Sequence, residues 1–222
     1  MNTDEPTPNE PTLDEPTAAA EPEPAPEATA EEATADEPTP EATAEDAAAD
    51  PTAPEPSDAP GRPLQLYLLR HADAGNPATW RGDDSDRPLT GKGRRQARWM
   101  GRWLTTQRKL PDVIVTSPKV RAAQTAVLAT EGSDLKLIVD ERLASGAGLD
   151  DVAAIVEEHA PKARRVMLVG HDPDFSEMAS ELTGASIAIK KGAVARIDIA
   201  GPVRPGAGTL RWLVPAEAVA EG

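Results

Sequence analysis

From residue 64 onward, short apolar runs alternate with segments of helical period, and this alternation limits the folds open to the chain. Strands that alternate with helices favour an α/β fold with three layers, α/β/α, around a mostly parallel central sheet. Two later segments, 192–200 and 209–215, alternate apolar and polar residues, as edge strands do. The other predicted strands are 64–70, 112–117, 135–140 and 165–170, and the predicted helices are 90–109, 120–129, 149–160 and 174–184.

The first 60 residues differ in composition from the rest of the chain. They contain 18 Asp or Glu, 13 Pro and no Lys, Arg, Gly or aromatic residue, whereas all 23 Lys and Arg follow them. Such a segment cannot bury enough apolar surface to offset the chain entropy lost on folding. We therefore predict a disordered acidic tail over 1–60 and one folded domain over 61–222. We interpret the tail as a solubilising spacer; the alternative is an acidic decoy that competes for a positively charged pocket of the domain.

Several classes of protein are excluded by composition. The chain has no cysteine, which excludes disulfides, thiolate metal sites and a cysteine nucleophile. No apolar run approaches the ~20 residues of a membrane helix, and the N-terminus lacks the pattern of a secretory signal. The acidic tail argues against nucleic-acid binding, whose main affinity term is the neutralisation of phosphates. We therefore expect a cytoplasmic protein that binds neither nucleic acid nor a membrane.

Cationic and imidazole side chains fall at the carboxyl ends of the predicted strands. The first strand ends in Arg70, and His71 follows it. The fourth strand is followed by His171, and Arg121 opens the helix after the second strand. The carboxyl ends of parallel strands share one edge of a sheet, where ligands bind in such folds, so we expect these four side chains to converge. A cluster of positive charges needs an anion, and guanidinium groups match the oxygens of phosphate bidentately, so the sequence predicts a phosphate site.

Four motifs carry these residues: "LYLLRHADA" (66–74), "RPLTGKG" (87–93), "TSPKVRAAQT" (116–125) and "VMLVGHDP" (166–173). In this order they resemble the histidine phosphatase superfamily, which also contains the phosphoglycerate mutases. The small domain and the "RPLT" segment make the chain most similar to the SixA-type phosphohistidine phosphatases. The resemblance covers roughly residues 64–215 and implies a phosphoglycerate mutase-like fold.

The resemblance also implies a role for each residue at the rim. His71 would be the nucleophile that forms a phosphoenzyme, which water then hydrolyses, and His171 would stabilise the transition state. Arg70 and Arg121 would hold the phosphoryl oxygens, with Arg87 as a further substrate contact. Because arginines carry the charge, we expect a phosphatase that needs no metal and no cofactor. Its expected partner is a phosphorylated substrate, a phosphohistidine protein.

The sequence does not identify a general acid. Glu141 is the candidate, because it is the nearest acidic residue by order to the acid of larger superfamily members. An alkoxide leaving group needs such an acid, whereas the imidazole of phosphohistidine leaves without much help, so a site with no acid suits a P–N bond. Two alternatives are a small-molecule phosphomonoesterase and a catalytically silent phosphate-binding module. One departure from the usual Arg-His-Gly motif is Ala72, which is still small enough to let a ligand approach.

Other polar residues receive a structural interpretation. His159 stands beside Glu158 at a predicted helix end, and we expect it to face solvent. Asp172 and Asp174 precede and open the last predicted helix, and we expect them to cap it.

Overall fold

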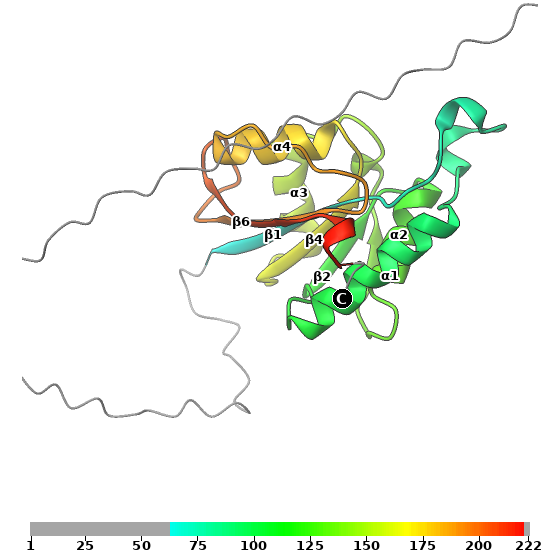
Figure 1. Cartoon of the computed structure of the whole chain (residues 1–222). Helices are drawn as coiled ribbons and strands as arrows, with labels where there is room; N and C mark the ends of the chain where they lie inside the picture. The colour runs from blue at the N-terminus through cyan, green and yellow to red at the C-terminus, as the bar shows by residue number, and fades with distance from the viewer. Residues whose placement is uncertain (1–62, 220–222) are drawn as a thin grey trace, which may run out of the picture. The chain divides into compact units, whose positions relative to one another are not determined.

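The structure is a computed structural model that describes residues 63–219, so the predicted tail over 1–60 lies outside the described residues. All ten predicted elements are present in order (Figure 1). Within this part of the chain, no helix combines the length and the apolar character needed to cross a bilayer. The strands are β1 (Leu64–Arg70), β2 (Val113–Thr116), β3 (Leu137–Val139), β4 (Arg165–Gly170), β5 (Val194–Ile199) and β6 (Gly208–Val214), and the helices are α1 (Gly91–Thr106), α2 (Val120–Ala129), α3 (Leu149–His159) and α4 (Asp174–Thr183).

The six strands form one sheet in the order β3-β2-β4-β1-β5-β6. Strands β1 to β4 are parallel, and β5 pairs antiparallel with both β1 and β6. The two faces of the sheet support separate cores, because successive side chains of a strand point to opposite faces. Leu66 and Leu68 of β1 pack with α3 and α4, whereas Tyr67 and Leu69 pack with α1 and α2 (Figure 1). The three-layer, mostly parallel arrangement predicted from the sequence is confirmed.

Strand β5 corrects one expectation, because it lies inside the sheet between β1 and β6; of the two segments predicted as edge strands, β6 alone lies at an edge. Five of the six residues of β5 are buried, and Arg196 is the half-buried exception. Its guanidinium donates from Nε to Asp198 at 2.7 Å. The polar positions that suggested an exposed edge therefore pair with each other within the strand.

Helix α1 packs closely against the segment that follows β1. Thr90 caps the helix, because its Oγ1 accepts a hydrogen bond from the N–H of Gly93 at 3.0 Å. Any Cβ at Gly93 would overlap the carbonyl group of Asp73, so glycine permits the close approach. The same hydroxyl of Thr90 donates to the Asp73 carboxylate at 2.7 Å. These contacts hold the chain just beyond His71 against a rigid helix.

Candidate active site

The carboxyl ends of β1, β2 and β4 meet at one rim of the sheet. The N–H of His71 donates to the carbonyl of Gly170, and the N–H of Ser117 donates to the carbonyl of Val169, both at 2.9 Å. These bonds continue the hydrogen-bond ladders between the parallel strands, so they fix the position of the residue that follows β1 and of the residue that follows β2. His71 and His171 follow adjacent parallel strands, and their ring centroids lie 5.2 Å apart. The structure thus brings together two histidines that are distant in the sequence.

An open cavity of about 330 Å³ lies over this rim, and all five residues singled out as catalytic or phosphate-binding line it, whereas Glu141 does not. Five of the lining residues are cationic and two are carboxylates, so the site suits an anion. Lys119 and Lys191 were missed by the sequence reasoning. Lys119 lies inside a motif already recognised, but Lys191 reaches the rim only because β5 runs antiparallel. The charged and imidazole lining residues are Arg70, His71, Arg87, Lys119, Arg121, His171, Asp172, Asp174 and Lys191.

His71 is oriented by the backbone carbonyl of the next residue. Its Nδ1 lies 2.8 Å from the carbonyl oxygen of Ala72. A carbonyl can only accept, so the proton sits on Nδ1 and the lone pair of Nε2 is free. Burial is the main reason that the pKa of His71 is lowered to about 4; the hydrogen bond to Ala72 opposes this shift, and the charges of Arg121 and Arg70 add to it. The imidazole is therefore neutral near pH 7 and able to act as a nucleophile.

Ala72 fits its position without opening the site. Its side chain is fully buried, and its N–H donates to Oγ1 of Thr125 at 3.1 Å. The methyl group packs with Leu89 and Ala97, and Ala72 is not one of the residues that line the cavity. The departure from Arg-His-Gly is therefore accommodated on the core side of the chain.

His171 is oriented by Ser117, whose Oγ lies 2.8 Å from Nε2. The same Oγ accepts a hydrogen bond from the N–H of Lys119 at 3.2 Å, which leaves its own proton to be donated to the imidazole. Nε2 then accepts, so Nδ1 carries the proton. That Nδ1 is buried and has no hydrogen-bond partner among residues 63–219, so the described residues leave its proton unsatisfied. Burial, followed by the nearby His71, lowers the pKa of His171 to about 3, which keeps the ring neutral.

The arginines are fixed by protein oxygens yet keep unused donors. Nη1 of Arg70 donates to the carbonyl of Ile189 at 2.8 Å, and Nη1 of Arg87 donates to the carbonyl of Ala74 at 2.7 Å. The Nε atoms of Arg70 and Arg121 are buried and lack a partner within the described part of the chain. A guanidinium with an unused buried N–H is ready to bind an oxyanion.

The two carboxylates that line the cavity, Asp172 and Asp174, bind donors of neighbouring segments of the chain. Asp174 was expected to cap α4, but its Oδ2 accepts from the N–H of Gly146 at 2.7 Å. Asp172 pairs with Arg70 at 3.3 Å and accepts from the hydroxyl of Ser176 at 2.6 Å. No side chain of the described residues caps the first turn of α4, so that prediction was wrong. Glu141 is exposed on the turn Glu141–Leu143.

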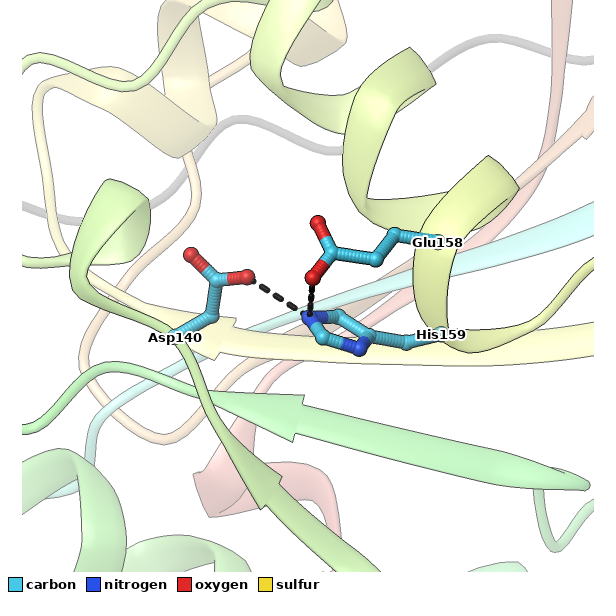
Figure 2. A group of neighbouring side chains, drawn as sticks. All are labelled: Asp140, Glu158 and His159. Carbon is cyan, nitrogen blue, oxygen red and sulfur yellow. Dashed lines mark hydrogen bonds and ion pairs between the residues drawn. The ribbon is translucent and has the colours of Figure 1, made fainter.

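His159 does not face solvent as expected. Figure 2 shows its Nε2 between two carboxylates, 2.8 Å from Asp140 and 3.9 Å from Glu158. The ligand atoms of these three residues lie within 4.8 Å of one another, which is a geometry that could hold a cation. Arg142 already supplies positive charge there, because its Nη2 donates hydrogen bonds to both carboxylates. Hydrogen bonds from Arg142 hold the pKa of Asp140 well below its usual range.

Comparisons with known proteins show which family the chain resembles. Residues 66–147 match the family model described as "Histidine phosphatase superfamily (branch 1)". The chain is 36% identical over 138 residues to an uncharacterized protein of Picosynechococcus sp., a match that covers 59% of this chain and 82% of that protein. It is 39% identical over 62 residues to the phosphohistidine phosphatase SixA of Escherichia coli, covering 28% and 37% of the two chains. The structure of the protein histidine phosphatase SixA complexed with tungstate superposes with a TM-score of 0.60 at 25% identity, covering 69% of this chain and 97% of that one.

Proposed function

This chain belongs to the histidine phosphatase superfamily, and we propose that it hydrolyses phosphohistidine on proteins through a phosphoenzyme at His71. The observation that carries the proposal is the state of His71, a neutral imidazole whose Nε2 is free while Nδ1 is held by a carbonyl. The surrounding cationic side chains support it, because phosphoryl transfer depends mostly on positioning and on stabilising charge at the phosphoryl oxygens.

In the first step, Nε2 of His71 attacks phosphorus in line with the bond to the substrate nitrogen. The new N–P bond forms as the substrate P–N bond breaks. A substrate ring protonated on its distal nitrogen leaves as neutral imidazole. The phosphorylated ring of His71 becomes cationic, and its Nδ1–H keeps the hydrogen bond to the carbonyl of Ala72. Arg70, Arg121 and the Nδ1–H of His171 are proposed to hold the phosphoryl oxygens.

In the second step, water attacks the phosphorus of the phosphoenzyme. The P–Nε2 bond breaks, inorganic phosphate leaves with one proton of the water, and the other proton passes to solvent. His71 returns to its neutral form with the proton still on Nδ1. The arginines supply the positive charge that the developing phosphoryl charge requires, so the proposed reaction needs no metal and no cofactor.

The choice of a P–N bond follows from the carboxylates of the cavity. Asp172 and Asp174, which line it, already bind protein donors, and Glu141 lies outside it. A phosphate ester needs a positioned acid to protonate its alkoxide, whereas a phosphohistidine does not. Lys119 and Lys191 widen the cationic surface of the open cavity, which suits a phosphate carried by a protein.

The test compares release of phosphate from a phosphohistidine protein and from an alkyl phosphate ester, phosphoserine, whose alkoxide leaving group needs a positioned acid. We expect the wild-type chain to hydrolyse the first substrate much faster than the second. His71→Ala should hydrolyse neither, whereas His159→Gln, which alters an imidazole away from the cavity, should keep activity. Rapid quenching with labelled substrate should trap an acid-labile, alkali-stable phosphoenzyme that is absent in His71→Ala. Equal or faster hydrolysis of the ester would instead support a small-molecule phosphomonoesterase.

A further inference from the structure

Asp84 contacts two of the cavity arginines from outside the cavity. It opens the short turn Asp84–Asp86, and its side chain is 51% exposed. It is absent from the cavity lining, to which Arg87 and Arg121 both belong. Both guanidinium groups are largely buried, with 8% and 7% of their side chains exposed.

Asp84 occupies one end of the Arg121 guanidinium. Nη2 of Arg121 lies 2.9 Å from Oδ2 of Asp84, and Nη1 donates to the Asp84 backbone carbonyl at 2.6 Å. Among the residues that the structure describes, Asp84 accepts all the hydrogen bonds that this guanidinium makes. The buried Nε–H of Arg121 is left without a partner. Asp84 therefore sets the orientation of the group while leaving donors free.

The second oxygen of the same carboxylate binds Arg87. Nε of Arg87 donates to Oδ1 at 2.8 Å. Two guanidinium groups that approach one cavity repel each other, and an ionised carboxylate between them offsets the repulsion. The hydrogen bond from Arg87 lowers the pKa of Asp84, so the carboxylate is charged at neutral pH.

We propose that Asp84 is a positioning residue that holds Arg121 and Arg87 in the orientation in which they bind the phosphoryl group. The role rests on the proposed function, but the geometry also makes a prediction that needs no turnover. The wild-type chain should bind any tetrahedral oxyanion at the rim more tightly than a variant without the Asp84 carboxylate. The opposite role, in which Asp84 competes with the anion, requires the carboxylate to stand inside the cavity. Its position outside the lining favours positioning.

The test measures binding of tungstate to the full chain by calorimetry, which needs no turnover. Asp84→Asn should bind tungstate about tenfold more weakly, because the amide cannot accept charge-assisted bonds from both arginines. Asp86→Asn is the matched control, since it removes the same charge from the same exposed turn and the side chain of Asp86 bonds to neither arginine; its affinity should stay within twofold of wild type. Thermal melts of both variants should match wild type, which separates positioning from unfolding.

A double-mutant cycle shows whether Asp84 acts through Arg121. In an Arg121→Ala background, Asp84→Asn should change tungstate affinity by less than about threefold, because its main target is gone. A full tenfold loss in that background, unchanged binding of Asp84→Asn alone, or tighter binding would each overturn the proposal. If the wild type binds tungstate but releases no phosphate from any substrate, the proposed function fails and the cycle still decides the role of Asp84.

Discussion

Lowering the pH should destabilise the fold through His71 in a way that one substitution can isolate. Burial lowers the pKa of His71 from 6.5 to about 4 in the folded chain. The unfolded state therefore takes up the proton first as the pH falls. Stability should decrease from about pH 6.5 downward, and the loss should be complete below about pH 4. Above pH 6.5 the imidazole is neutral in both states and makes no pH-dependent contribution.

The magnitude follows from the two pKa values. At pH 4.5 almost every unfolded imidazole is protonated but only about a quarter of the folded ones are, which costs about 2.5 kcal/mol of folding free energy. His71→Asn removes the titrating group, and its amide can still donate to the carbonyl of Ala72. Urea unfolding of both proteins at pH 7.5 and pH 4.5 should show the wild type losing about 2.5 kcal/mol more than the variant over this range.

The buried His171 and carboxylates such as Asp140 also add acid sensitivity, but they are present in both proteins, so their contributions largely cancel in the comparison. A histidine NMR titration gives an independent check, because the His71 resonance should not shift until the pH is well below 6. An equal loss of stability in the two proteins, or a midpoint near 6.5 for His71, would refute the argument that burial keeps this imidazole neutral.

Three other substitutions test the site and its support. Ser117→Ala removes the group that sets the His171 tautomer, so kcat on a phosphohistidine protein should fall about tenfold with little change in KM; steady-state kinetics with both constants unchanged would contradict this. Arg121→Lys keeps the charge but loses the planar fork, and calorimetry should show tungstate affinity reduced by about tenfold or more. Gly93→Ala should lower stability in urea unfolding by about 1–3 kcal/mol, because a Cβ would overlap Asp73, whereas the same change in an open helix stabilises it.

The elements and the rim of the sheet could be predicted because they depend on periodicity and topology. Apolar runs located the strands, and parallel pairing then placed Arg70, His71, Arg121 and His171 at one edge. The roles of these residues came from a resemblance and remain proposals. Strand β5 was misread because an ion pair inside the strand imitates the polar alternation of an exposed edge.

Contacts between loops could not be predicted in the same way. Asp84 meets Arg121 across 37 residues of chain, and no periodic pattern marks that pairing. His159 was expected in solvent, but the turn after β3 brings Asp140 against the end of α3. Ser117 lay inside a recognised motif, yet its bond to His171 depends on the register of β2 and β4. Side chains in irregular segments are placed by tertiary packing, which local sequence does not encode.

The place of β4 in the sheet has a consequence for when the proposed activity can arise during folding. β4 lies between β1 and β2, although it follows both in the sequence. Until it inserts, His171 is not beside His71, and the rim lacks half of its imidazoles. Such long-range pairing forms late and slowly compared with local contacts. A nascent or partly refolded chain should therefore release no phosphate. After denaturation, phosphate release should return only when β4 has paired with both β1 and β2.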